Sequence, residues 1–395
     1  MKDLSVEEAR ARMLAEAPPV QVETVSLDAA RGRTLAEPVR AMRDQPPFDA
    51  SAMDGWAVPA EGQELAIVGE SAAGKGYGQP LSPGQAVRIF TGAPVPLGAD
   101  RVVIQEEAAR DGDRVRVPAG KGAQHYIRPR GGDFRSEQVL LHTGERVDAW
   151  RLGLIAASGR AEVSVARRPR VVILSTGEEL AAAGSAAGPE QIFDSGSPAI
   201  GALIEAWGGA ATRLASTGDD IDVIAQAVEQ AGGDLIVTIG GASVGDHDLV
   251  KPAMARLGLA LKVETVRVRP GKPTWFGRLA DGRLVLGLPG NPASALVCAE
   301  LFLRPLLLAM QGADPAMTLS TAFVTQPLPA NGPREHWMRA RLSIEQGRWI
   351  AQPMSDQDSS LISVFASASG LIRRAVGAPA AEAGDLVDTL PLDRL

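Results

Sequence analysis

The segment 240–248 has the composition of a ligand-binding loop. It reads Gly-Gly-Ala-Ser-Val-Gly-Asp-His-Asp and follows the apolar run 235–239. Paired glycines let backbone amides approach an anion or an aromatic ring, and carboxylates such as those of Asp246 and Asp248 are the oxygen ligands that Mg2+ takes in proteins. Acids here could instead cap a helix, but two of them after a Gly-rich loop favour a site for a ligand and a metal.

Two further strand ends have the same character. The run 171–174 leads into Ser-Thr-Gly-Glu-Glu-Leu at 175–180, and a run ending at residue 288 leads into Pro-Gly-Asn-Pro-Ala-Ser at 289–294. A strand that opens into a helix presents unpaired backbone N–H groups, which bind anions. The carboxylate of Glu178 is a candidate for chemistry there, although a carboxylate at a helix N-terminus can serve only to stabilise the helix.

The segment 267–273 gathers fixed positive charge. It reads Arg-Val-Arg-Pro-Gly-Lys-Pro. Arginine and lysine held on a stiff turn suit an oxyanion. The alternative is a solvated surface loop, but three cations beside a Pro-Gly turn seldom cluster without an anion to bind.

A region rich in proline and glycine, from about 40 to 134, supplies further polar candidates. Its segments 48–58, 88–96 and 128–133 contain Asp54, Thr91 and Asp133 respectively. An isolated aspartate commonly supports a turn, and the segment around Asp133 fits a solvated hairpin tip equally well. Composition alone therefore gives these residues no assigned role.

Several familiar catalytic patterns are disfavoured. The segment 69–75 fits G-x-x-x-x-G-K, but Gly76 replaces the required Ser or Thr and no helix is predicted over 77–84, so a phosphate-binding P-loop is not expected. The four histidines are scattered without an H-x-x-x-H spacing, which disfavours zinc catalysis. The sequence has no G-x-S-x-G elbow, which disfavours a serine hydrolase.

The composition indicates a globular protein large enough for two or more domains. The chain has 395 residues, of which 45% are hydrophobic and 22% charged. A net charge of -7 gives no basic field for nucleic acid, and the single cysteine, Cys298, excludes a disulfide framework within one chain. The apolar run 296–310 is short for a bilayer and is interrupted by charged residues and a proline. We therefore expect a cytoplasmic protein that binds neither nucleic acid nor membrane.

The elements expected around these motifs predict an α/β multidomain fold. Helices are predicted over 4–17, where Ser5 and Glu8 have capping-box spacing, and over 148–158. From residue 168, strands at 171–174 and 235–239 alternate with helices at 198–207, 221–231 and 249–257, which is typical of a parallel sheet with ligands at its strand carboxyl ends. Strand-like runs after 310 predict a small β-barrel or sandwich. We predict four domains: a discontinuous N-terminal helical and linker domain (1–40 and 135–167), a projecting β-rich module (41–134), a parallel-sheet α/β cofactor-binding domain (168–312) and a C-terminal β-barrel (313–395).

Taken together and in this order, the motifs resemble the molybdopterin molybdenumtransferase family, relatives of the gephyrin E domain. The likeness spans nearly the whole chain and rests on the runs 48–58, 88–96, 175–180, 240–248, 270–273 and 288–294. It implies a homodimer whose active site lies between the molybdopterin-binding α/β domain of one subunit and the β-rich module of the other. The adenylyltransferase of the same pathway and molybdenum apoenzymes are the protein partners that it implies.

The implied reaction is Mg2+-dependent hydrolysis of adenylylated molybdopterin, with insertion of molybdenum from molybdate and release of AMP. Carboxylates and fixed cations suit the cleavage of a phosphoanhydride. Carried over by position, the resemblance implies catalytic roles for Asp54, Thr91, Asp133, Glu178 and Asp248, and metal ligation by Asp246 and Asp248. It implies cofactor contacts for Asp194, Gly240, Gly241, Ser243, Pro289, Gly290, Asn291 and Ser294. It implies molybdate contacts for Arg269, Lys272, Pro273, Arg339, Ser359 and Ser360.

Two positions depart from the family pattern, and two alternative functions stay open. Arg269 stands where the family has Lys, and Gly196 stands where it usually has Asn. A non-catalytic scaffold is one alternative, which the retained acids and cations disfavour. The other is the adenylyltransferase, whose fold shares the Gly-Gly loop and the Pro-Gly-Asn-Pro turn but lacks counterparts of the residues before 165 and after 315.

Overall fold

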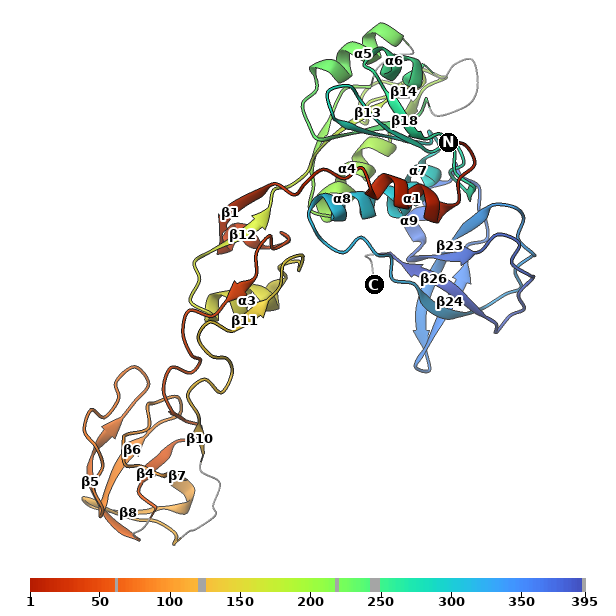
Figure 1. The fold of residues 1–395 in the computed structure, drawn as a ribbon. Coiled ribbons are helices and arrows are strands. Elements are labelled where there is room, and N and C mark those ends of the chain that lie inside the picture. The colour runs from red at the N-terminus through yellow and green to blue at the C-terminus, as the bar shows by residue number, and fades with distance from the viewer. Residues whose placement is uncertain (61–62, 120–125, 217–219, 242–248, 393–395) are drawn as a thin grey trace. The chain divides into compact units, whose positions relative to one another are not determined.

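The computed structural model describes residues 1–60, 63–119, 126–216, 220–241 and 249–392. The chain divides into two compact units (Figure 1): unit 1 contains residues 1–23, 32–36 and 165–395, and unit 2 contains residues 24–31 and 37–164. The backbone therefore passes between the units at 23/24, 31/32, 36/37 and 164/165. The finer division into four domains stays a prediction.

Unit 1 is built on a six-stranded sheet in the order β16, β13, β17, β21, β20, β18. The first four strands are parallel, β20 pairs antiparallel with β21, and β18 pairs antiparallel with β20 at the edge. The strands are β13 Arg170–Ser175, β16 Ala210–Arg213, β17 Leu235–Ile239, β18 Ala260–Val263, β20 Trp275–Arg278 and β21 Leu284–Leu288. The helices are α1 Val6–Leu14, α4 Gly196–Ala206, α5 Ile221–Gln230, α6 Val250–Arg256, α7 Pro292–Cys298 and α8 Arg304–Met310. This architecture confirms the predicted α/β fold class.

Both faces of this sheet are buried, which explains why its strands are apolar at successive positions. In β13, Val171 and Ile173 pack in one core cluster with residues of α1, α4, α7 and α8. Val172 and Leu174 point to the opposite face and pack with residues of α5 and α6. With both faces covered, the carboxyl ends of the strands are the part of the sheet left open to a ligand.

The longest apolar run belongs to the core of unit 1. Helix α7 continues through a π-helical stretch, Ala299–Leu303, into α8. The run Pro292–Met310 is long and apolar enough to cross a membrane, but 83% of its most apolar window is buried inside the structure. Its buried acid, Glu300, pairs with Arg304 at 3.3 Å. The run is therefore accounted for as a core helix.

A second sheet of unit 1 closes into a barrel. Because β23 pairs with both β24 and β25, five strands form a closed ring in the order β23, β24, β22, β26, β25. Their bounds are β22 Ser320–Val324, β23 Glu335–Glu345, β24 Arg348–Pro353, β25 Gly370–Arg374 and β26 Leu386–Pro391, and a short helix, α9 Ile362–Ser367, lies between β24 and β25 in the chain. Strand β19, Val268–Arg269, pairs with β23 and so ties the cation-rich segment to the barrel.

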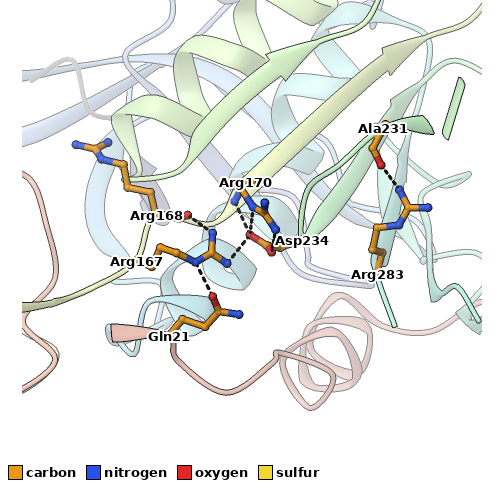
Figure 2. Close-up of polar contacts among 7 residues, drawn as sticks. All are labelled: Gln21, Arg167, Arg168, Arg170, Ala231, Asp234 and Arg283. Carbon is orange, nitrogen blue, oxygen red and sulfur yellow. Dashed lines mark hydrogen bonds and ion pairs between the residues drawn. The ribbon is translucent and has the colours of Figure 1, made fainter. Parts of the chain in front are cut away.

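An ion-pair network fixes the chain where it enters the α/β sheet at the amino-terminal ends of its strands (Figure 2). The carboxylate of Asp234 pairs with Arg167 at 3.0 Å and with Arg170 at 3.1 Å. Arg167 also donates to the side-chain oxygen of Gln21 at 2.6 Å, so both chain passages near the edge of unit 1 are held together. These contacts account for the arginines in structural terms.

Unit 2 contains a six-stranded sheet in the order β7, β4, β6, β5, β9, β8. Its strands are β4 Gly55–Val58, β5 Glu64–Ser71, β6 Gln85–Ile89, β7 Arg101–Ile104, β8 Ala109–Asp111 and β9 Arg114–Arg116. The smaller elements are β2 Val39–Arg40, β3 Ala50–Ser51, β10 Ile127–Arg128, β11 Val139–Leu141, α2 Leu27–Ala30, α3 Ala149–Ala157 and a 3-10 turn, Gln105–Glu107. After β5 the chain makes a tight turn between Ala72 and Lys75, and residues 72–84 contain no helix, as the rejection of a P-loop predicts.

Candidate active site

A cleft of about 1140 Å³ opens at the carboxyl ends of β13, β17 and β21. After β13, the chain forms β16 on one side of this strand and then β17 on the other, so the cleft lies at the topological switch point of the sheet. Loops before β20, directly before β23 and between β24 and β25 complete the lining. The predicted site residues that line it are Asp194, Gly240, Gly241, Arg269, Lys272, Pro273, Pro289, Gly290, Asn291, Ser294, Ser359 and Ser360.

The Gly-Gly turn after β17 admits no side chains. Gly240 and Gly241 have φ values of +90° and +56°. A Cβ at Gly240 would lie 2.6 Å from the Thr176 carbonyl oxygen, and one at Gly241 would lie 2.2 Å from Val250 Cγ2. Glycine is therefore required for the backbone to turn here against Thr176. The predicted residues that follow the turn, Ser243, Asp246 and Asp248, lie outside the described residues.

Carboxylates line the β13 end of the cleft. Glu179 faces the cleft, whereas Glu178 is not part of its lining and accepts a hydrogen bond from Gln191 through its backbone carbonyl at 3.4 Å. Asp194 lies in the lining and accepts hydrogen bonds from the backbone N–H of Ser197, at 3.0 Å, and from its hydroxyl, at 2.5 Å. Asp194 therefore stabilises the start of α4 as well as facing the cleft.

Helix α7 begins at the cleft and contacts the barrel. Asn291 precedes its first residue, and the Asn291 amide donates to the Ser359 hydroxyl at 2.8 Å. The backbone N–H of Ala293 donates to the Ser359 carbonyl at 3.1 Å. These bonds hold the loop 357–360, which follows β24, against the α/β sheet.

The cation loop is shaped by a glycine packed on the single cysteine. Gly271 has a φ of +114°, and a Cβ there would lie 2.1 Å from the sulfur of Cys298. The Thr274 hydroxyl donates to the Gly271 carbonyl at 2.8 Å and lies 3.1 Å from the same sulfur. Burial raises the pKa of the Cys298 thiol to about 12, so it stays protonated as a structural group. The contacts of Gly271 with Cys298 and Thr274 thus fix the loop that carries Arg269 and Lys272.

Arg339 is a buried cation behind the loop 357–360. It lies on β23 with 0% of its surface exposed, and it donates to the Asp358 carbonyl at 2.9 Å. Among the described residues, its Nε and Nη1 groups have no hydrogen-bond partner. Burial lowers the pKa of Arg339, and the carboxylates of Asp356 and Asp358 oppose that shift. Burying a cation with unpaired donors destabilises a fold, so its presence here favours an anion-binding role.

The same corner has a positive electrostatic potential. His336 on β23 is paired in register with Arg269 on β19. Burial, and then the charges of Arg269, Arg339 and Arg334, lower the pKa of His336 to about 4. Since His336 is neutral at physiological pH, the fixed positive charge comes from the arginines and Lys272. This corner suits an oxyanion.

The remaining predicted residues lie in unit 2. Asp54 is partly exposed and accepts hydrogen bonds from the backbone N–H and the hydroxyl of Thr91, each at 2.7 Å. These bonds, the backbone one first, hold the pKa of Asp54 below its ordinary value. Asp133 is exposed, and its backbone N–H donates to the Gln45 carbonyl at 2.9 Å. Unit 2 therefore presents an ionised carboxylate in a fixed orientation.

Sequence reasoning did not select several residues that line the cleft, namely Ser175, Thr176, Glu179, Arg334, Gln357 and Asp358. Ser175 ends β13 and Thr176 follows it, at a strand end that was predicted to bind a ligand, so their hydroxyls could have been chosen from that position. Gln357 and Asp358 carry no local sequence signal, because they reach the cleft through the closure of the barrel.

Comparisons with known proteins match three family models in chain order. The MoeA N-terminal region (domain I and II) matches residues 4–159, the probable molybdopterin binding domain matches 172–309, and the MoeA C-terminal region (domain IV) matches 321–392. A molybdopterin biosynthesis MoeA protein from Pyrococcus horikosii has a similar structure, with a TM-score of 0.84 at 28% identity, covering 99% of both chains.

Curated relatives agree with these models. Molybdopterin molybdenumtransferase 2 of Mycobacterium tuberculosis is 37% identical over 366 residues, covering 88% of this chain and 90% of that protein. The molybdopterin molybdenumtransferases of Nostoc sp. and Haemophilus influenzae are 34% and 32% identical, covering 82% and 99% of this chain and 78% and 99% of those proteins. With the fold and the cleft described above, these matches show that the chain belongs to the molybdopterin molybdenumtransferase family, enzymes of molybdenum cofactor biosynthesis.

Proposed function

We propose that this enzyme hydrolyses adenylylated molybdopterin in a Mg2+-dependent reaction and inserts molybdenum from molybdate into the dithiolene, releasing AMP. The observation that carries the proposal is that a single cleft combines a side-chain-free turn after β17 with a fixed cation loop. The turn at Gly240 and Gly241 suits a cofactor that approaches the backbone closely. The cations Arg269 and Lys272 suit an oxyanion and a developing negative charge.

The oxyanion end of the cleft is where we place molybdate. Arg269, Lys272 and Pro273 line it on one side, and Ser359 and Ser360 line it on the other. Arg339 lies behind that second wall with unpaired donors on its guanidinium. A dianion held here would offset a buried positive charge that, among the described residues, has two guanidinium nitrogens without hydrogen-bond partners.

The proposed Mg2+ ligands are Asp246 and Asp248. They follow the Gly240–Gly241 turn, which itself lines the cleft, and carboxylates are suitable ligands for a hard divalent cation. In the described part of the chain, no group of three metal-binding side chains offers another site. When bound, Mg2+ would offset negative charge on the phosphoanhydride.

We further propose a homodimer in which Asp54, Thr91 and Asp133 of one chain serve the cleft of the other. These residues belong to unit 2, whereas the cleft belongs to unit 1. The ionised Asp54, fixed by Thr91, is suited to orient a water or a metal-bound group. Light scattering should give a dimer mass at micromolar concentration, and a monomer mass would contradict this arrangement. We place the reaction in the cytoplasm, with the adenylyltransferase of the pathway and molybdenum apoenzymes as partners.

One assay tests the central proposal. The purified protein, given adenylylated molybdopterin, molybdate and Mg2+, should release AMP and yield a cofactor that activates a molybdenum apoenzyme. The same assay separates an enzyme from a scaffold, which would release no AMP above a protein-free control. An adenylyltransferase would instead consume ATP and form the adenylylated substrate.

Two variants separate the proposed roles of the metal ligand and the oxyanion-binding cation. Asp248→Ala should abolish AMP release and leave molybdate binding intact, because a metal ligand acts on the transferring phosphoryl group. Lys272→Ala should weaken molybdate binding at least about tenfold, because a fixed cation contacts the oxyanion. If Asp248→Ala instead lowers the melting temperature and leaves AMP release at the wild-type rate, its role is helix capping.

A further inference from the structure

Two buried hydroxyls in the cleft have no hydrogen-bond partner among the described residues. Ser175 and Thr176 are 2% and 5% exposed, and both line the cleft. Neither hydroxyl has a partner within the part of the chain that the structure describes. Buried polar atoms in folded proteins are almost always hydrogen-bonded, so an unpaired one at a binding cleft points to a ligand that completes the bond.

The Gly240–Gly241 turn packs directly against the residue that carries one of these hydroxyls, Thr176. Thr176 follows the last residue of β13, and its N–H donates to the Ile239 carbonyl at 3.1 Å, which places it beside the end of β17. The turn at Gly240 and Gly241 comes so close that a Cβ at Gly241 would lie 3.2 Å from the Thr176 hydroxyl oxygen. Gly240 and Gly241 line the cleft with backbone atoms alone, so a planar group in the cleft can lie against this turn beside Thr176.

The charge distribution indicates which part of a ligand this end of the cleft accepts. Glu179 and Asp194 line the β13 end, whereas Arg269 and Lys272 come just before β20. In the sheet, β17 and β21 separate β13 from β20, so the two ends are three strand spacings, or roughly 14 Å, apart. An anion at the β13 end would face two carboxylates. A neutral heterocycle with N–H donors on its edge fits there instead.

We infer that the hydroxyls of Ser175 and Thr176 bind the polar edge of the pterin ring. They thereby orient the substrate with its ring at the β13 end and its anionic groups toward Arg269 and Lys272. This inference rests on the proposed function and adds two specificity-determining residues to it. The hydroxyls suit the ring because each can both donate and accept hydrogen bonds, and the amide-like edge of a pterin offers both acceptors and donors.

The test compares an unpaired buried hydroxyl with a paired one. Thr176→Val removes the unpaired hydroxyl without changing the shape of the side chain. Thr389→Val is the matched control: Thr389 is 1% exposed in the barrel and donates to the Ser320 carbonyl at 3.1 Å. The control should lower the melting temperature because a satisfied bond is lost and should leave ligand binding unchanged. Thr176→Val should leave the melting temperature unchanged or raise it.

Binding measurements complete the test. Thr176→Val should lower the affinity for adenylylated molybdopterin at least tenfold and leave the dissociation constant for molybdate unchanged. Ser175→Ala should act in the same direction. A neutral pterin without phosphate should compete for the wild-type site, and Thr176→Val should reduce its affinity but not that of inorganic phosphate.

The inference is overturned if Thr176→Val binds adenylylated molybdopterin as tightly as the wild type does. It is also overturned if this variant loses as much thermal stability as Thr389→Val, since its hydroxyl would then be bonded in the free protein. Loss of phosphate affinity rather than pterin affinity would assign the hydroxyls to the phosphate and contradict the orientation. A wild-type protein that fails to bind adenylylated molybdopterin at all would refute the proposed function as well.

Discussion

Replacing Gly271 with alanine should disturb both the fold and the oxyanion corner, for two separable reasons. The residue has a φ of +114°, which alanine rarely adopts, and its added Cβ would lie 2.1 Å from the sulfur of Cys298. Backbone strain of this kind costs about 1–3 kcal/mol. Overpacking against a buried group costs about another 1–3 kcal/mol. Gly271→Ala should therefore lower the free energy of unfolding by about 2–6 kcal/mol.

Two companion variants separate the two contributions. Gly384 in the barrel has a φ of +94° and nothing within 4 Å of an added Cβ, so Gly384→Ala measures the backbone strain alone. The double variant Gly271→Ala/Cys298→Ala removes the sulfur and should recover the packing loss but not the strain. Urea unfolding followed by tryptophan fluorescence in a Trp56→Phe background measures unit 1, because Trp275 and Trp337 are buried there and Trp56 is the buried tryptophan of unit 2.

The same variants should affect molybdate binding measured by calorimetry. Since Gly271 directly precedes Lys272, a displaced loop moves the cation away from the oxyanion, and Gly271→Ala should weaken binding while Gly384→Ala should not. If Gly271→Ala and Gly384→Ala are equally destabilised, or if removing the sulfur rescues nothing, the loop is not packed on Cys298 as described.

Three further predictions follow from the site. Thr91→Val should raise the pKa of Asp54 toward its ordinary value, because it removes one of two hydrogen bonds to the carboxylate. The stabilisation from these bonds is present above the ordinary pKa and is lost as pH falls through the folded pKa, so the variant should lose it at a higher pH. An unchanged titration of the Asp54 carboxyl by NMR would argue against the hydroxyl bond. Cys298 should resist iodoacetamide at pH 8 in the folded protein and react in urea, since burial raises the pKa of its thiol to about 12 and blocks access. Mass spectrometry measures the extent of labelling, and rapid labelling of the native protein would contradict the burial. Arg339→Met should leave the melting temperature unchanged or higher, because it removes a buried cation whose Nε and Nη1 have no partner among the described residues. It should nevertheless lower the affinity for molybdate at least about tenfold, or 1.4 kcal/mol. A less stable variant with normal affinity by calorimetry would show that the arginine is structural.

The α/β sheet was the part of the fold best predicted from sequence. The strand predicted at 235–239 has the same bounds in the structure, and the helix predicted at 221–231 is one residue shorter, ending at Gln230. Both faces of these strands are buried, so an apolar run bounded by glycines is a strong signal. The helix predicted over 4–17 spans Val6–Leu14. The capping box of Ser5 and Glu8 defines its start, and it ends shortly before Pro18 and Pro19, which disfavour helix in the residues before them.

The candidate site was predicted in part, for a physical reason. The glycine turns and the cation loop carry local signals, since each needs particular residues in a row. The loop 357–360 reaches the cleft because β23 closes the barrel and α7 bonds to Ser359, which depends on contacts between distant segments. The unpaired hydroxyls of Ser175 and Thr176 depend on the register between β13 and β17. Neither property is encoded in a short stretch of sequence.

The assembly of unit 1 from three separate chain segments constrains the order in which the protein folds during synthesis. Helix α1 packs in the core cluster that contains α8, and Leu4 exchanges backbone hydrogen bonds with Thr265 at 3.2 Å and Arg267 at 2.7 Å. These partners leave the ribosome long after α1, and closing such a long loop is slow. Unit 2, which comes almost entirely from 37–164, can fold while α1 waits with its apolar face unpaired. The N-terminal helix therefore cannot dock until the chain has been synthesised through α8, and its addition then completes this core.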